Sequence, residues 1–249
     1  CQSCGVCDFQ TIEPRVFAAS EIHGSETQVD PPVPTHTDVL RYRISYAKTG
    51  PARVFGHLEL ANIMFRAFRR AKIPVEFSVG FHPKPKISFD DPLPVGMESL
   101  HETCVVSARP VFSTSEMMDR LNQALPEGLT VTRWEIFSSK KEYIACKDIS
   151  YAIQLKTGVF EQHRLESFRV GESFVKPRVR KGAMSLVNYS EHVQRLELDG
   201  VDSLLLTIRS GQNQTIRPSE VLSAIFDLSE DAIKTARIVK LSPAVQIPK

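Results

Sequence analysis

Two histidines and a tyrosine are the side chains of this sequence best suited to acid–base chemistry. His57 opens a helical pattern, His82 lies in a proline-rich loop, and Tyr46 lies in a strand pattern. Because imidazole titrates near neutral pH, such groups could cleave RNA by general acid–base catalysis. Histidines in these settings more often stabilise the fold or contact phosphates, and Asp90 and Asp91 precede a proline, as turn residues do. We therefore predict no catalytic residues in this chain.

Three cysteines at the start of the sequence have the spacing of metal ligands. Cys1, Cys4 and Cys7 match the first three ligands of a bacterial 4Fe–4S run, but Thr11 takes the place of the fourth. Zinc is the alternative metal, and it also lacks one ligand here. We expect these cysteines to bind a metal in the intact protein, with the last ligand supplied from outside this chain.

The composition limits the class and compartment of the protein. An odd number of cysteines, five in all, and no N-terminal secretory signal favour a reducing, cytoplasmic setting. No apolar run approaches the roughly 20 residues that span a bilayer, so we expect no membrane partner. Because the first of the 249 residues is Cys and not Met, we expect the chain to be a piece of a longer polypeptide.

Positive charge is concentrated in one part of a chain whose formal net charge is only +2. Between residues 41 and 86 the acids are Glu59 and Glu76, against ten cations. The cations are Arg41, Arg43, Lys48, Arg53, Arg66, Arg69, Arg70, Lys72, Lys84 and Lys86. A localised basic face favours a polyanionic partner. The alternative is that cations near the end of a helix only complement its dipole, worth about 0.3–1 kcal/mol each.

Two basic segments could follow a phosphate backbone. Two prolines hold the loop 80–86 extended, and a second basic run, 176–182, occupies a comparable place in the second half. The two could line one groove between two domains, or each could be a solvated charge run. Nearby Phe81, Phe89 and Phe174 could stack on bases or belong to the core.

We predict that structured RNA binds to these two basic segments through its backbone. The predicted contacts are Arg53, His57, Arg66, Arg69, Arg70, His82, Lys84, Lys86, Arg178, Arg180 and Lys181.

The hydrophobic periodicity predicts the elements that must position these residues. The first half reads as strand, helix, two strand pieces, strand, helix and strand, at 39–47, 57–72, 76–81 with 86–89, 102–109, 113–125 and 129–137. The second half reads as strand, helix, two strands, helix and strand, at 149–155, 160–168, 186–198, 203–209, 217–228 and 235–241. This βαββαβ order predicts an α+β fold of two tandem ferredoxin-like domains, 39–138 and 148–249, behind a cysteine-containing tail and linker, 1–38.

Several segments resemble a known family, the radical-SAM-associated domain found fused behind radical SAM proteins with a cobalamin-binding-type region. These segments are GPAR (50–53), GHLEL (56–60), FRRA (68–71), SVGFHPKPKISF (78–89) and PLPVGMES (92–99). The resemblance covers about residues 40–245, and CQSCGVCDF (1–9) is similar to the end of the preceding radical SAM region. It implies an upstream domain that carries S-adenosylmethionine and a 4Fe–4S cluster, with no cofactor bound by the folded domains here. The usual radical SAM ligand spacing, C-x3-C-x2-C, is absent from this chain.

Together these features predict a non-catalytic module that presents tRNA, rRNA or another structured RNA to the upstream radical SAM domain. One alternative is an RNA-acting enzyme on a ribonuclease-like or pseudouridine-synthase-like scaffold, which fold analogy alone supports weakly. Another is a docking domain that binds only its radical SAM partner.

Overall fold

Buried and more exposed side chains alternate along a central strand of the first half. Along β1 (Leu40–Lys48) the side chains of Tyr42, Ile44 and Tyr46 are buried, whereas Arg41 is exposed. Successive side chains of a strand point to opposite faces, so the three buried residues lie on the core face. The strand predicted at 39–47 is confirmed within one residue at each end.

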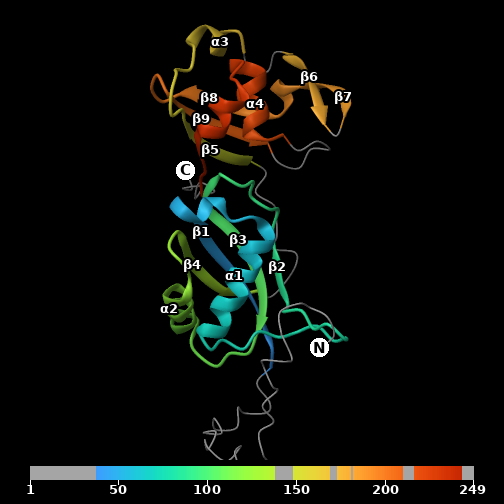
Figure 1. The fold of residues 1–249 in the computed structure, drawn as a ribbon, viewed down its shortest axis with the longest axis vertical. Helices are drawn as coiled ribbons and strands as arrows, with labels where there is room; N and C mark the ends of the chain where they lie inside the picture. The colour runs from blue at the N-terminus through green and yellow to red at the C-terminus, as the bar shows by residue number, and fades with distance from the viewer. Residues whose placement is uncertain (1–37, 138–147, 169–172, 181, 210–215, 243–249) are drawn as a thin grey trace, which may run out of the picture. The chain divides into compact units, whose positions relative to one another are not determined.

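The protein has a mixed α+β fold with one large, mostly antiparallel sheet and few helices (Figure 1). The structure, a computed structural model, describes residues 38–137, 148–168, 173–180, 182–209 and 216–242, and residues 38–249 belong to one unit. The first half, residues 38–137, contains β1, α1 (His57–Arg70), β2 (Ile87–Phe89), β3 (Glu98–Ala108), α2 (Thr114–Ala124) and β4 (Leu129–Ile136). The second half, residues 148–242, contains β5 (Asp148–Gln154), α3 (Gln162–Glu166), β6 (Val175–Arg180), β7 (Ala183–Asn188), β8 (Val193–Leu198), β9 (Ser203–Arg209), α4 (Pro218–Phe226), α5 (Glu230–Thr235) and β10 (Arg237–Lys240).

The same strand order recurs in the two halves. In the first half, β1 and β3 are central, with β4 beside β1 and β2 beside β3, and every neighbouring pair is antiparallel. In the second half, β5 and β9 are central, with β10 beside β5 and β8 beside β9, again all antiparallel. The hairpin β6–β7 forms a separate two-stranded sheet.

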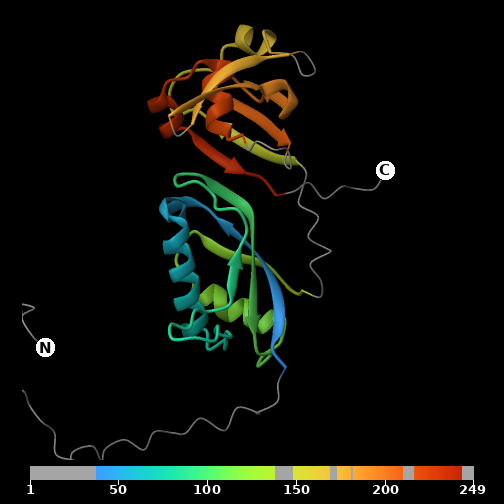
Figure 2. The ribbon, with the colours of Figure 1, turned by 90° about the vertical axis from the view of Figure 1, so that its right-hand side faces the viewer.

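The helices pack on the sheet through apolar residues at helical spacing. Figure 2 shows α1 and α2 beside the sheet of the first half. Met64 and Phe68 of α1 and Met117 and Leu121 of α2 are fully buried in one cluster with β1 and β3. Ser113 caps α2, because its Oγ accepts a hydrogen bond from the Glu116 N–H. In the second half, α4 buries its apolar face in a second cluster with β5 and β9.

The two halves share one sheet because β10 pairs in parallel with the start of β3. The register places Val239 opposite Glu98 and Lys240 opposite Ser99. Arg237 donates two hydrogen bonds to the buried Glu98 carboxylate, at 3.1 and 3.0 Å. Strand pairing and ionic contacts therefore join the halves at this end of β3.

Several predicted elements differ from the structure. β3 begins at Glu98, four residues before the strand predicted at 102–109, and α3 is shorter than the helix predicted at 160–168. The strand predicted at 76–81 is a loop with only single bridges, because two prolines interrupt its pairing. The strand predicted at 186–198 is two strands, β7 and β8, separated by a 3₁₀ turn, Tyr189–Glu191. The helix predicted at 217–228 ends at Phe226, and α5 follows it without having been predicted. The segment 176–182, predicted as a loop, largely belongs to β6.

The predicted tail and interdomain boundary fall mainly on 1–37 and 138–147, outside the described residues.

Candidate functional site

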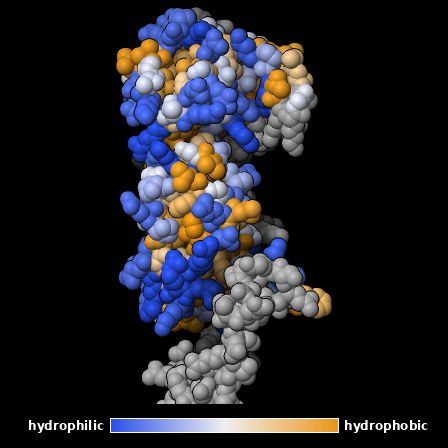
Figure 3. All heavy atoms as spheres, in the orientation of Figure 1, coloured by the Kyte–Doolittle hydropathy of each residue, from blue (hydrophilic) through white to orange (hydrophobic). Residues whose placement is uncertain are grey.

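Four exposed cations lie in the last turns of α1 and just after its end. Leu60, Met64, Ala67 and Phe68 bury one face of α1, so the polar residues between them face solvent. The helix ends at Arg70, and Lys72 adopts a left-handed conformation with φ 57° before Pro74. The exposed cations are Arg66, Arg69, Arg70 and Lys72. Figure 3 shows hydrophilic side chains gathered over this end of α1.

Residues 76–86, here named the basic loop, form a closed turn after α1. The Ser78 N–H donates to the Lys84 carbonyl at 2.8 Å, and the Lys84 N–H donates to Ser78 Oγ at 3.0 Å. These bonds hold the tip outside the sheet, and Val79 and Phe81 there are fully exposed. The outer end of this loop is hydrophobic in Figure 3. An exposed apolar tip of this kind is typical of a contact surface.

The basic loop also presents exposed cations. His82, Lys84 and Lys86 are all exposed. Lys86 Nζ lies 3.1 Å from the carboxylate of Glu76, an ion pair in which both side chains are partly exposed. Such a pair holds Lys86 only weakly. Among the described residues, Lys84 has no ion pair.

A hollow of about 410 Å³ lies between the end of α1 and the start of the basic loop. Phe65 and Phe77 line it, and their rings meet edge to face with centroids 5.7 Å apart. Arg69 and Lys72 also line it. The hollow thus combines aromatic walls with cations.

The second basic segment has a different environment. It lies on β6, where the Arg178 side chain is only 10% exposed and its Nη1 lies 3.4 Å from the Glu220 carboxylate of α4. Arg178 is therefore held by the fold and is not presented to solvent. Arg180 ends β6, and Lys181 lies outside the described residues.

The two basic segments lie beside different parts of the sheet. The basic loop follows Val75, which bridges to Ala108 at the last residue of β3, and precedes Ile87, which pairs with Val106. The second half joins β3 at Glu98 and Ser99 instead. With 11 residues, β3 is about 35 Å long. The described contacts therefore do not bring the two segments into one groove.

Two other predicted contacts lie away from the basic loop. Arg53 Nη1 lies 4.0 Å from the Glu98 carboxylate, near the junction of the halves. His57 is the first residue of α1, and 14 helical residues separate it by about 20 Å from the end that leads to the basic loop. His57 and His82 consequently do not form the acid–base pair that the sequence suggested as an alternative.

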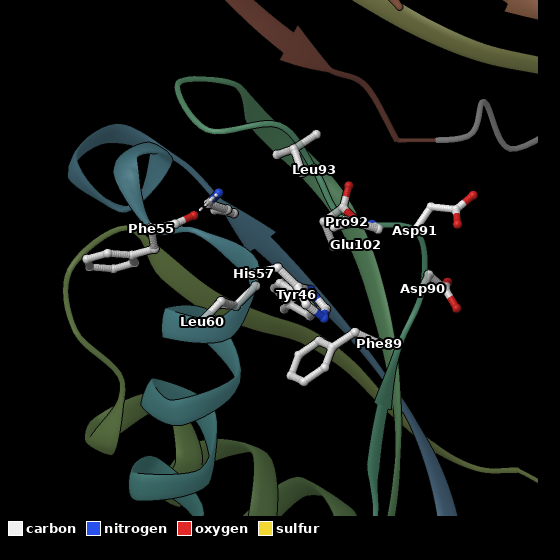
Figure 4. Close-up of a pocket in the computed structure, with 11 residues that line it drawn as sticks. Tyr46, Phe55, His57, Leu60, Phe89, Asp90, Asp91, Pro92, Leu93 and Glu102 are labelled. Atoms are coloured by element: carbon white, nitrogen blue, oxygen red, sulfur yellow. Dashed lines mark hydrogen bonds between the residues drawn. The ribbon is translucent and has the colours of Figure 1, made fainter. Parts of the chain in front are cut away.

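A small polar pocket lies beside the start of α1. Figure 4 shows Tyr46 and His57 close together beside Phe89, and the His57 and Phe89 ring centroids are 5.6 Å apart. Asp90 also lines the pocket and accepts a hydrogen bond from Thr103 Oγ1. The enclosed volume is about 10 Å³, roughly the space for one water molecule.

Two buried charges lie deeper in this polar pocket. Lys48 is only 1% exposed, and its Nζ donates to the Phe55 carbonyl at 2.8 Å. Burial lowers the pKa of Lys48, and the nearby negative charge of Glu102 partly opposes this shift. Glu102 is itself buried and accepts a hydrogen bond from Lys240 Nζ at 2.8 Å. Burial also raises the pKa of Tyr46, so its phenol stays protonated at neutral pH.

Sequence reasoning missed the buried ions, although a signal for them exists. Lys48 follows Tyr42, Ile44 and Tyr46 at alternate positions of β1, so the pleat directs it to the core face. Glu102 precedes Cys104 in the same alternation on β3. A charged residue in register with buried apolar ones is thus detectable from the sequence.

Among the described residues the structure shows no metal site. No group of three or more His, Cys, Asp or Glu side chains within them could hold a metal ion, and Cys1, Cys4 and Cys7 lie outside them. In the described part of the chain, no helix is both long and apolar enough to cross a membrane.

The fold and these surfaces define an α+β protein with an exposed basic region and a buried ionic pocket. The chain belongs to the family described as "Uncharacterized protein conserved in bacteria (DUF2344)", whose match spans residues 41–218. No curated protein matches the sequence. A crystal structure of an unknown protein from Galdieria sulphuraria is similar at 12% identity, covering 69% of this chain and 81% of that chain, with a TM-score of 0.26.

Proposed function

We propose that this chain is an RNA-binding module whose contact surface is the end of α1 together with the basic loop. The observation that carries this proposal is the set of exposed cations on the end of α1 and on the basic loop, whose tip exposes an aromatic ring. The cations are Arg66, Arg69, Arg70, Lys72, His82, Lys84 and Lys86, and Phe81 is the exposed aromatic. Cations bind phosphates, and an aromatic ring offers a stacking platform to bases.

Backbone contact is the main source of affinity in this proposal. Each cation that neutralises a phosphate releases a counterion, so the affinity should fall steeply as salt is added. The surface contains one partly exposed acid, Glu76, which Lys86 already neutralises. Arg178 is left out of the contact surface because it pairs with Glu220.

The wider setting of the module is part of the same proposal. The recurring strand order supports two ferredoxin-like modules, each with a βαββαβ order, the second carrying the additional hairpin β6–β7. The sequence resemblance supports an upstream radical SAM domain in the same polypeptide, to which the module would present tRNA, rRNA or another structured RNA. Cys1, Cys4 and Cys7 would then bind an iron–sulfur cluster or zinc.

The test is RNA binding to this chain, measured by filter retention or anisotropy over a series of salt concentrations. We expect log affinity to fall with log salt by about 0.7–0.9 per phosphate contact. Replacing Lys84 and Lys86 with Glu should weaken binding at least about tenfold and make this slope shallower by about 2. The charge-matched control replaces the exposed Lys156 and Lys234 of the second half with Glu. Affinity that does not change with salt, or that falls equally in both double variants, would refute the proposal.

One observation favours an RNA-acting enzyme as the second candidate. Tyr46 and His57 line the same polar pocket, and His57 is exposed at its rim. A proton-transfer role would require the RNA to reach this rim. Incubation of the chain with end-labelled RNA separates the candidates, since a binding module leaves the RNA intact and an RNA-acting enzyme cleaves or isomerises it. A docking domain for the radical SAM partner would bind no RNA in either experiment.

A further inference from the structure

The hollow beside the basic loop has the chemistry of a site for a flat apolar ring with an anionic tail. Its walls are Phe65, Phe77 and the apolar segment 73–75, and its volume of about 410 Å³ lies in the range of about 300–1,000 Å³ typical of ligand pockets. Its cations are Arg69 and Lys72. A nucleotide combines these two properties in one unit.

We propose that this hollow binds an unpaired nucleobase of an RNA strand, with Arg69 and Lys72 on the adjacent phosphates. The inference rests on the proposed RNA-binding function and makes it more specific, because it names single-stranded nucleotides as the ligand. Phe77, which is 43% exposed, is the stacking surface, and Phe65 supports its ring edge to face.

The charges around the hollow favour a nucleotide over an apolar peptide. Arg69 and Lys72 line it, and the exposed Arg66 precedes Arg69 by three residues on the same helix face. The acid closest to it in sequence is Glu76, which is paired with Lys86. An acidic backbone is therefore complementary to this surface, and a neutral apolar chain would leave the cations without partners.

The position of the apolar groups favours an unpaired base over a duplex. Bases inside a duplex have both faces covered by their neighbours, so they offer no free face to Phe77. A single strand offers such faces, and successive bases can stack on Phe77 and on the fully exposed Phe81 of the basic loop.

The lining also predicts weak base preference. Phe65, Phe68, Ile73, Pro74, Val75 and Phe77 have no side-chain hydrogen-bonding group, and Arg69 and Lys72 are assigned to phosphates in this proposal. Base identity is read by hydrogen bonds to base edges, whereas stacking accepts every base. The site should therefore tolerate all four bases.

The test compares two RNAs of equal length, a mixed-sequence single strand and its perfect duplex, with the whole chain. Replacing Phe77 with Ala should weaken single-strand binding about tenfold and leave the duplex affinity and both salt slopes unchanged. Phe77→Leu keeps apolar volume but removes the ring, so it should show most of the same loss. Leu186→Ala removes a more exposed apolar side chain, 72% against 43%, from β7 outside the proposed surface and is the control.

A fluorescent base gives an independent readout. A single strand containing 2-aminopurine should lose fluorescence on binding when that base stacks on Phe77, and Phe77→Ala should restore it.

The outcomes separate the two proposals. If neither RNA binds with a salt-dependent affinity, the proposed function fails, and the nucleobase site fails with it. If both RNAs bind but Phe77→Ala leaves the single-strand affinity unchanged, the nucleobase site alone is refuted. Equal losses for the single strand and the duplex would refute it as well, because they would show that Phe77 contacts no free base face.

Discussion

Two basic segments occupy equivalent places in the two halves of the described chain, and the fold uses their charges differently. The basic loop lies between α1 and β2, and the hairpin β6–β7 lies between α3 and β8, so each precedes an edge strand of its half. In the basic loop, Lys84 is exposed. On β6, Arg178 is mostly buried against Glu220.

The hairpin exposes apolar residues, as the tip of the basic loop does. Val179 pairs with Met184 and Pro177 with Leu186, and Val179, Met184 and Leu186 are 68–75% exposed. Alternate residues of β6 point to opposite faces, so the outward face is apolar and Arg178 lies on the inward one. The contrast shows that the number of cations in a segment does not determine whether they reach solvent. An acidic residue on another element can pair with a cation and keep it away from solvent.

The largest expected difference between the two segments is in stability. Glu220→Ala leaves the mostly buried Arg178 without this carboxylate and should cost about 2–3 kcal/mol, between the values for exposed and fully buried pairs. Glu76→Ala breaks the Lys86 pair, which is partly exposed, and should cost about 0–1 kcal/mol. Urea denaturation of the two variants measures both values. Equal losses would mean that burial does not distinguish the two pairs.

Local patterns predicted much of the fold. Hydrophobic periodicity predicted β1, β9 and α2. The split between β7 and β8 was missed because Val187, Tyr189 and Val193 are all buried, so the apolar pattern continues through the turn.

The candidate site was predictable only in part. Exposure of Lys84 and Lys86 follows from their proline-rich loop. The partner of Arg178 was not predictable, because Glu220 lies 42 residues further along the chain and on another element. The hollow was also missed, since it needs Phe77 of the loop to meet Phe65 of α1. Both features depend on tertiary contacts that a local pattern does not contain.

The second expected difference is in how stability depends on pH. His192, beside the hairpin, is 5% exposed, and burial lowers its pKa below the ordinary value of 6.5, with further influence from Glu191, Arg178, Arg209 and Glu220. The unfolded chain then binds the proton more readily, so this contribution to stability is complete above about pH 6.5 and is lost as the pH falls towards the folded-state value.

His192→Gln should therefore flatten the fall in stability between about pH 7.5 and pH 5.5. The measurement is the urea midpoint across this range, and the slope is compared because the replacement can also change stability at every pH. His82→Gln, in the exposed basic loop, is the control. A slope that stays the same in His192→Gln would show that another group causes the pH dependence.

The smallest expected effect tests whether Glu76 limits the basic surface. Its carboxylate lies 3.1 Å from Lys86 Nζ, and it is the acid within the basic loop. Glu76→Gln removes its negative charge and releases Lys86 for a phosphate, so RNA affinity should rise about two- to fivefold at low salt, the equivalent of one exposed ion pair. Glu230→Gln releases Lys234 on α5 in the same way and should leave RNA affinity unchanged, because that lysine lies outside the proposed surface. If both variants bind RNA more tightly by the same factor, net charge and not the position of the basic loop determines the affinity.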